Sequence, residues 1–245
     1  KLRPPVMEMR AGIPVDGITL SAVLHEPAGV PRWPAVVAAH GLLSGKASDK
    51  YLRLAAALPR QGIALCRFDF RGCGESGGAL ADATLSAWLR DLQAVITWVR
   101  AREGFDGGLG LMGSSMGGFL SVSAAAADRG VGATVTWATP VALHDLAARQ
   151  DVLRESGLGE PFLAELRSGR MLEAPEGVAN ILIVHGDGDD VVPVKHAHLL
   201  WERAADPKRL EILAGADHRI LDPAQRDRAV AFTVAWFRER FAGAP

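Results

Sequence analysis

Short apolar runs alternate with helical patterns through most of the chain, and this alternation limits the possible folds more than any other feature. The apolar runs lie at residues 34–41, 63–70, 109–114, 131–138, 180–186 and 209–213. Between them lie helical patterns at 49–62, 82–102, 116–127, 194–205 and 223–241. In the second of these, Leu85, Leu89, Leu92 and Ile96 share one face. Buried strands that alternate with helices form right-handed βαβ units. The sequence therefore predicts an α/β fold with a mostly parallel sheet and helices on both faces.

Two segments depart from this alternation. Residues 17–27 alternate polar and apolar side chains, which is typical of a half-buried strand near an antiparallel edge. About forty residues separate the run that ends near Ala138 from the run that begins near Asn180. This is longer than a single crossover helix. We therefore predict a small helical cap at 140–179, inserted into a core domain formed by residues 1–139 and 180–245.

Composition excludes several classes of partner. The chain has 245 residues, a net charge of −1 and 49% hydrophobic residues, which is typical of one globular core. It lacks the basic excess that nucleic-acid binding needs, and charges or prolines interrupt every apolar run before it reaches the length of a membrane span. We therefore expect a small-molecule partner, no nucleic acid and no membrane. The oligomeric state stays open, with a homodimer as one outcome.

The cysteines and the first residues bear on the compartment. Cys66 and Cys73 form neither a disulfide framework nor a zinc cluster, so a reducing compartment and a cytoplasmic location are expected. The opening residues "KLRPPVMEMR" lack the apolar core of a signal peptide. Because residue 1 is not Met, a leader removed from the chain stays open as an alternative.

The stretch "LGLMGSSMGGF" contains the pattern G-x-S-x-G with Ser115 at its centre. This pentapeptide is a weak signal alone, because a glycine-rich turn with incidental serines is the commoner reading. Here it follows an apolar run and opens a helix rich in small residues. A serine held on such a sharp turn has an exposed hydroxyl, and the glycines remove collisions between strand and helix. Ser114 does not fit, since Met112 stands where its upstream glycine would be.

A serine nucleophile needs a base and an acid that orients the base. In folds of this kind both follow the serine in the chain, each on a loop after a strand. His218 lies in such a loop after the run 209–213, whereas His144 falls in the predicted cap and His185 precedes the acids. His196 and His198 lie on a predicted helix and point to different faces. The loop "HGDGDDVVP" offers three acids, Asp187, Asp189 and Asp190, and composition does not choose among them.

Five pieces of the chain together resemble the α/β-hydrolase superfamily. They are "HGLLSG", "DFRGCGES", "GSSMGG", "HGDGDDVVP" and "GADH", in the order that the superfamily has them, from His40 to His218. The resemblance implies an α/β-hydrolase fold with a cap, and its pattern D-x-x-V-P aligns the catalytic acid with Asp189. Among members, the chain is similar to small bacterial carboxylesterases of the cinnamoyl or feruloyl type, and to dienelactone-hydrolase-like and serine-aminopeptidase-like relatives.

The resemblance also implies an oxyanion hole, and the sequence of the predicted cap offers residues for a pocket. The backbone N–H groups of Leu42 and Met116 are the expected oxyanion donors, the second at the start of the elbow helix. We predict that the substrate contacts apolar side chains at a strand end beside the cap and in the cap itself. These side chains are Trp137, Leu143, Leu146 and Phe162.

These residues predict a serine hydrolase that cleaves carboxylic esters, preferably short-chain or compact aromatic acyl esters, through Ser115, Asp189 and His218. No metal or organic cofactor is implied. Two G-x-G-x-x-G matches, at 72–77 and 108–113, do not open directly into a helix as a dinucleotide site requires. Two alternatives stay open. One is a peptidase or amidase that holds a substrate amine on the cap glutamates Glu155, Glu160, Glu165 or Glu173. The other is a non-catalytic ligand-binding protein of the same fold.

Overall fold

The structure, a computed structural model of the chain, describes residues 6–148 and 150–242. The strands are β1 (Val6–Val15), β2 (Ile18–Pro27), β3 (Trp33–Ala39), β4 (Ala64–Phe68), β5 (Phe105–Ser114), β6 (Val131–Trp137), β7 (Ile181–Gly186) and β8 (Lys208–Leu213). The helices are α1 (Asp49–Ala57), α2 (Leu85–Arg100), α3 (Met116–Ala127), α4 (His144–Ala147), α5 (Gln150–Glu155), α6 (Glu160–Arg167), α7 (Lys195–Arg203) and α8 (Pro223–Phe241). Strands and helices alternate as the sequence predicts.

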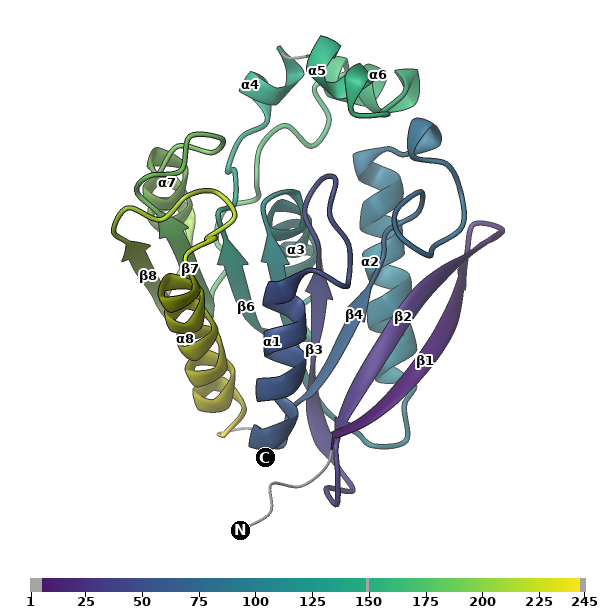
Figure 1. Cartoon of the computed structure of the whole chain (residues 1–245), viewed down its shortest axis with the longest axis vertical. Coiled ribbons are helices and arrows are strands. Elements are labelled where there is room, and N and C mark those ends of the chain that lie inside the picture. The colour runs from purple at the N-terminus through teal and green to yellow at the C-terminus, as the bar shows by residue number, and fades with distance from the viewer. Residues whose placement is uncertain (1–5, 149, 243–245) are drawn as a thin grey trace.

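The eight strands form one sheet in the order β1-β2-β4-β3-β5-β6-β7-β8. All neighbours from β4 to β8 are parallel, and β2 pairs antiparallel with both β1 and β4. The carboxyl ends of the parallel strands therefore meet at one edge, the upper edge in Figure 1. This is the edge at which open α/β sheets carry their sites.

Helices cover both faces of the sheet, with α1 and α8 on one face and α2, α3 and α7 on the other (Figure 1). The first face buries Leu54 and Leu58 against Phe237 of α8. On the second face, Trp88 and Leu92 of α2 pack with Phe119 of α3. Each face forms its own continuous apolar cluster, so the sheet is the central layer of three, as predicted.

The strand β1 was not predicted, because the sequence analysis places the first strand at residue 17. In the structure β1 pairs with β2 along its whole length, and Asp16 and Gly17 form the turn with φ of 47° and 79°. Such a pair of positive φ values is typical of a two-residue hairpin. Of the β1 side chains only Ile13 is buried, so the strand has no apolar alternation to reveal it.

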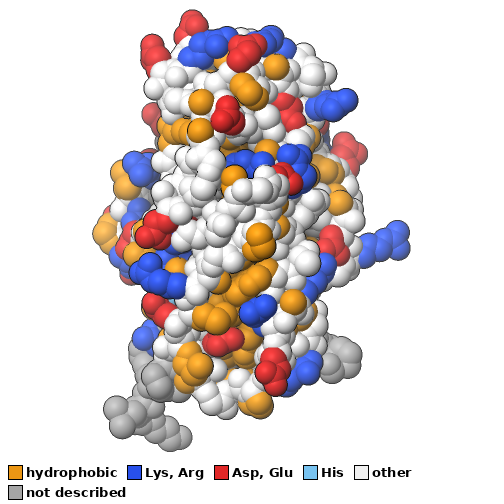
Figure 2. Space-filling model, turned by 90° about the vertical axis from the view of Figure 1, so that its right-hand side faces the viewer, with side chains coloured by type: hydrophobic (Ala, Val, Ile, Leu, Met, Phe, Trp, Pro, Cys, Tyr) orange, Lys and Arg blue, Asp and Glu red, His pale blue; other side chains and the backbone are white. Residues whose placement is uncertain are grey.

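The long interval between β6 and β7 contains α4, α5 and α6, which lie above the upper edge of the sheet (Figure 1). An isolated antiparallel bridge pairs Ala142, near the start of this interval, with Glu173, near its end. Its apolar side chains face inward: Phe162 and Leu163 of α6 are fully buried, and the Phe162 ring lies 5.6 Å from the Trp88 ring of α2. Its outer surface carries charges of both signs, visible at the top of Figure 2. Among the described residues, no helix has the length and apolar character needed to cross a membrane.

Candidate active site

Ser115 lies at a strained turn between β5 and α3. Its φ of 55° and ψ of −122° fall outside the regions that residues with a Cβ normally adopt. The Ser115 N–H donates to the Trp137 carbonyl at 2.8 Å, which ties the turn to the neighbouring strand. A Cβ on Gly113 would lie 2.2 Å from the Gly117 carbonyl oxygen, and one on Gly117 would lie 2.1 Å from the Ala39 carbonyl oxygen. Both glycines are therefore required for the close approach of α3 to the sheet.

His218 and Asp189 complete a continuous chain of contacts with Ser115. His218 Nε2 lies 3.1 Å from Ser115 Oγ, and His218 Nδ1 lies 2.8 Å from Asp189 Oδ2. The three side chains follow the carboxyl ends of β5, β7 and β8; β7 and β8 are adjacent in the sheet, and β6 lies between β5 and β7. Ser115 is partly exposed and the His218 side chain is 17% exposed, so a small molecule can reach both. Asp189 is buried beneath them.

The hydrogen bonds around Asp189 hold it as a carboxylate. Burial would raise its pKa, but hydrogen bonds from His185, His218 and the Val192 N–H outweigh burial and hold the pKa well below its usual range. Oδ1 accepts from the backbone N–H groups of Val191 at 3.0 Å and Val192 at 2.8 Å. An ionised Asp189 requires a proton on His218 Nδ1, which leaves Nε2 free to accept from the Ser115 hydroxyl.

The other two acids of this loop do not reach His218 in the structure. Asp187 is exposed and its Oδ1 accepts from the Gly215 N–H. Asp190 is exposed as well. The sequence analysis missed the part played by His185, whose Nε2 lies 2.8 Å from the Val192 carbonyl oxygen and 3.3 Å from Asp189 Oδ2. Its place at the end of a buried strand, four residues before Asp189, was the available signal.

The two expected oxyanion donors are Leu42 and Met116, of which Met116 directly follows Ser115 in the chain. Met116 opens α3, and the first N–H groups of a helix have no acceptor within it. Leu42 follows Gly41, where an added Cβ would lie 3.1 Å from the Ser115 Cβ. The buried His40 ring fixes this loop, because its Nδ1 contacts the Gly41 carbonyl at 2.8 Å and its Nε2 accepts from the Phe70 N–H at 3.0 Å. His40 thus joins the loops after β3 and β4.

The structure corrects the predicted pocket. Trp137 is fully buried on the α8 side of the sheet, where its Nε1–H donates to Thr233 Oγ1 at 3.0 Å, so it does not line the site. Leu143 and Phe162 are buried in the contact between the 138–180 interval and the core, and Leu146 is half-buried beside them. The apolar side chains on the site loops that are exposed are different ones, Leu43, Val191 and Leu221.

Lys50 is a neighbour of the turn that sequence reasoning missed. It lies at the start of α1, and its Nζ donates to Ser114 Oγ at 2.7 Å. Burial is the main cause that lowers its pKa to about 8, with the nearby Arg226 and Arg219 adding to the effect. Its ammonium also lies 5.8 Å from the centre of the Trp137 ring. Nothing in the pattern of the helix 49–62 marks this lysine as different from one at the surface.

Comparison with known proteins places the chain among the α/β hydrolases. The family described as serine aminopeptidase, S33, matches residues 31–168. The uncharacterized protein YfhR of Escherichia coli is 30% identical over 186 residues, which cover 75% of this chain but 62% of that protein, so the chain spans less than two thirds of that relative. The mitochondrial palmitoyl-protein thioesterase ABHD10 of mouse is 26% identical over 219 residues, covering 79% of this chain and 71% of that protein. The structure of Est1E from Butyrivibrio proteoclasticus with ferulic acid bound has the same fold, with a TM-score of 0.79 at 22% identity over 95% of this chain and 99% of that one.

Proposed function

The chain belongs to the serine aminopeptidase S33 family of α/β hydrolases, and we propose that it is a serine hydrolase that cleaves carboxylic esters. The observation that carries the proposal is the chain of contacts from Ser115 Oγ through His218 to the carboxylate of Asp189, at 3.1 and 2.8 Å. The strained backbone of Ser115 supports it, since strain of this kind gathers at functional sites.

In this mechanism Ser115 Oγ attacks the acyl carbon and its proton passes to His218 Nε2. Asp189 stabilises the imidazolium that forms, and His218 then protonates the departing alkoxide. A water molecule next attacks the acyl-enzyme while His218 takes a proton from it. The bond between Ser115 Oγ and the acyl carbon then breaks, His218 returns the proton to Oγ, and the acid is released. The N–H groups of Leu42 and Met116 bind the oxyanion in both steps, each contributing roughly 2.7–4 kcal/mol.

The environment of the glutamates in the 138–180 interval favours an ester over a peptide substrate. An aminopeptidase needs a carboxylate that is free to bind the substrate amine. Glu160 is instead paired with Arg154 and Arg167, and Glu173 contacts Arg203 and His144.

Glu165 is also engaged, because both of its oxygens accept from the Ser86 N–H at the start of α2. Of the four glutamates named above, only Glu155 lies exposed without such a bond among the described residues. The family's name therefore does not by itself decide the substrate.

The exposed apolar side chains of the site loops favour an uncharged, compact substrate. Leu43 follows the Leu42 oxyanion donor, Val191 follows the acid, and Leu221 follows the base. The proposed substrates are short-chain or compact aromatic acyl esters. Est1E, whose structure holds ferulic acid, supports an aromatic acyl group. The thioesterase ABHD10 supports a longer acyl chain on sulfur, which is the competing choice.

The test compares Ser115→Ala with Ser114→Ala in p-nitrophenyl acetate turnover, with thermal unfolding of both variants. We expect Ser115→Ala to lower kcat by about 10⁴-fold or more while the protein stays folded. Ser114→Ala removes the acceptor of Lys50 and should keep activity within about tenfold of the wild type, because a hydrogen bond is worth about 1 kcal/mol. The opposite ranking of the two variants would overturn the assignment.

A further inference from the structure

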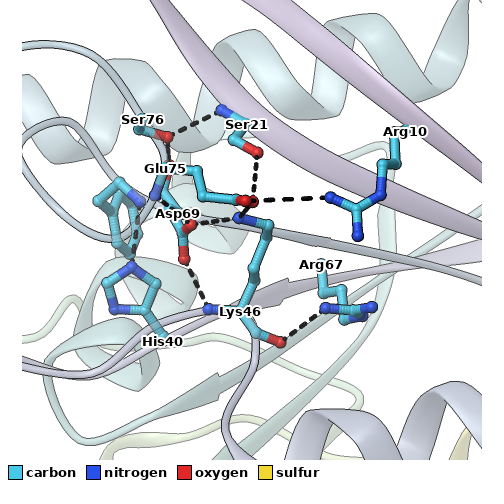
Figure 3. A network of polar contacts seen from close by, with 9 residues as sticks. Arg10, Ser21, His40, Lys46, Arg67, Asp69, Glu75 and Ser76 are labelled. Carbon is cyan, nitrogen blue, oxygen red and sulfur yellow. Dashed lines mark hydrogen bonds and ion pairs between the residues drawn. The ribbon is translucent and has the colours of Figure 1, made fainter.

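A hollow lies away from Ser115, on the face of the sheet that α1 covers. It measures about 360 Å³ and lies between the β1–β2 hairpin, the end of β4 and the loop that holds Lys46. Arg10, Val23 and Arg67 are direct neighbours across β1, β2 and β4, so their side chains share this face. Figure 3 shows Arg10 and Arg67 near Lys46, Asp69 and Glu75. The volume suits a small molecule.

Arg67 is the unusual member of this group. Its side chain lines the hollow and is only 9% exposed. Its Nε donates to His25 Nε2 at 2.8 Å, and its Nη1 donates to the Lys46 carbonyl at 3.2 Å. No carboxylate forms an ion pair with Arg67 within residues 6–148 and 150–242, and Nη2 has no acceptor there. Buried guanidinium groups are normally paired, because removing their charge from water is costly.

The nearby carboxylates are already engaged by other cations. Lys46 Nζ contacts Asp69 Oδ2, and lies 2.6 Å from Glu75 Oε2. Asp69 also accepts from the backbone N–H groups of Lys46 at 2.7 Å and Glu75 at 3.0 Å. Arg10, on the exposed rim, lies 3.9 Å from Glu75. The residues that line the hollow thus include three cations and two carboxylates, an excess of one positive charge, and outside the lining Glu8 is the carboxylate whose charge acts most strongly on Arg67.

His25 does not offset that charge. Its Nε2 accepts from Arg67, which requires the ring to be neutral, and burial together with the charge of Arg67 lowers its pKa. Glu8, the next carboxylate along this face, contacts the other ring nitrogen of His25 at 3.3 Å. The guanidinium therefore presents its unused N–H groups to the hollow, with Val23 and Leu52 supplying an apolar wall.

We propose that this hollow binds a small carboxylic acid as its anion, with the Arg67 guanidinium as the bidentate anchor and Arg10 as a weaker contact at the rim. A planar fork of N–H donors matches a carboxylate. The single excess charge suits a monoanion, whereas a phosphate dianion would meet Asp69 and Glu75 with a charge that nothing compensates. The site does not depend on the chemistry of Ser115.

The experiment titrates benzoate into the full chain, with benzamide as the neutral isostere and inorganic phosphate as the dianion. Calorimetry gives the affinity, and the arginine Nε–Hε resonance of Arg67, assigned by its loss in Arg67→Lys, gives the location. We expect saturable binding of benzoate that shifts this resonance, with benzamide and phosphate binding at least about tenfold more weakly. A shift of this resonance places the ligand here rather than at Ser115.

Variants then test the anchor. Arg67→Lys keeps the charge but loses the fork, and should weaken benzoate binding by about tenfold or more. Arg10→Ala should weaken it by about threefold, since its guanidinium is exposed. Arg129→Ala, an exposed arginine after α3, is the matched control and should change nothing. Should Arg67→Lys fail to fold by circular dichroism, through-bond correlation from the backbone to the side chain assigns the Arg67 resonance in the wild type instead, and its shift together with the Arg10→Ala result decides. Benzoate that fails to saturate, leaves the Arg67 resonance in place, or binds no better than phosphate overturns the proposal.

Discussion

At the scale of single residues, the three aspartates of the loop after β7 differ sharply in their surroundings. Asp189 contacts His218 and is buried, whereas Asp190 is exposed. We predict that Asp189→Asn lowers kcat for p-nitrophenyl acetate by about 10⁴-fold, because an amide no longer fixes the His218 tautomer or stabilises the imidazolium. Asp190→Asn is the control and should stay within about threefold, as expected for a surface change.

Circular dichroism of both variants separates lost activity from lost structure. A sensitive Asp190 beside a tolerant Asp189 would show that the acid lies one residue further along the chain. Asp187→Asn weakens the bond to the Gly215 N–H and should affect stability more than kcat.

Lys50 gives a prediction for stability against pH. Its pKa is lowered to about 8 by burial, from the 10.5 of a free lysine. Below pH 8 the folded and unfolded chains both hold this proton. Between about 8 and 10.5 only the unfolded chain holds it, so the free energy of unfolding should rise with pH there, by on the order of 3 kcal/mol.

Lys50→Met should remove this rise, and Lys195→Met, at an exposed lysine of α7, should keep it. The measurement is urea unfolding at a series of pH values, with the difference between wild type and variant plotted against pH. A difference that does not change between pH 7 and 11 would contradict a lowered pKa at Lys50.

The sequence could place some of the site residues and not others, for reasons that are local. Ser115 follows from two glycines and a strand-to-helix turn, and His218 from chain order. Choosing Asp189 from its loop required a family resemblance, because the partners of three neighbouring acids depend on the loop's folded path.

Trp137 was misjudged, although it shares a strand face with Ala133 and Val135, and that face packs under α8. Lys50 gave no signal, since its burial comes from distant elements.

At the scale of elements, a side chain of α6 caps the N-terminus of α2. Thr84 accepts from the Ala87 N–H at the start of α2, and Glu165 of α6 accepts from the Ser86 N–H at 3.1 Å. Glu165 therefore caps a helix to which it does not belong. We predict that Glu165→Ala lowers the free energy of unfolding by about 1 kcal/mol and speeds hydrogen exchange at 84–88 and 160–167.

Glu155→Ala, on an exposed position of α5, is the control and should change neither property. A different outcome would be informative. If Glu165→Ala left stability unchanged but raised KM for aminoacyl amides, Glu165 would be a substrate ligand and the peptidase alternative would replace the ester.

The helices and strands were predictable where burial of one face gives the apolar residues a regular spacing along the sequence. The run 116–127 predicts α3 with the bounds that the structure has, because small residues pack it closely on the sheet. A Cβ at Gly118 would lie 1.9 Å from Thr139 Oγ1. The strand β1 was missed because hydrogen bonds to β2, rather than burial, hold it in place. The Asp16-Gly17 turn was its only local signal.

At the scale of the whole molecule, the packing of α4, α5 and α6 on the core leads us to expect a short substrate. The side chains of Leu143 and Phe162 are buried in this contact, so they are not open to a long acyl chain. The outer surface of the interval is charged, unlike the broad apolar face with which a helix lies on a lipid surface. The sequence predicted an interval at this place, but its length alone could not show which of its apolar residues are already engaged.

We therefore predict that kcat/KM across p-nitrophenyl esters is highest between acetate and hexanoate and falls toward palmitate, with methyl ferulate also accepted. We propose the exposed Leu43, Val191 and Leu221 of the site loops as the rim of the site. Each CH₂ that stays in water forgoes about 0.8 kcal/mol of transfer free energy, so lengthening the acyl chain beyond this rim brings no gain. Leu43→Ser should lower kcat/KM for hexanoate about fivefold and for acetate hardly at all, because acetate is too short to reach the rim. Lys195→Ser, on the exposed side of α7, is the control for surface changes. A maximum at palmitate, or activation by an oil–water interface, would mean that α4 to α6 move away from the core to admit the chain, and that the buried Leu143 and Phe162 form the acyl site after all.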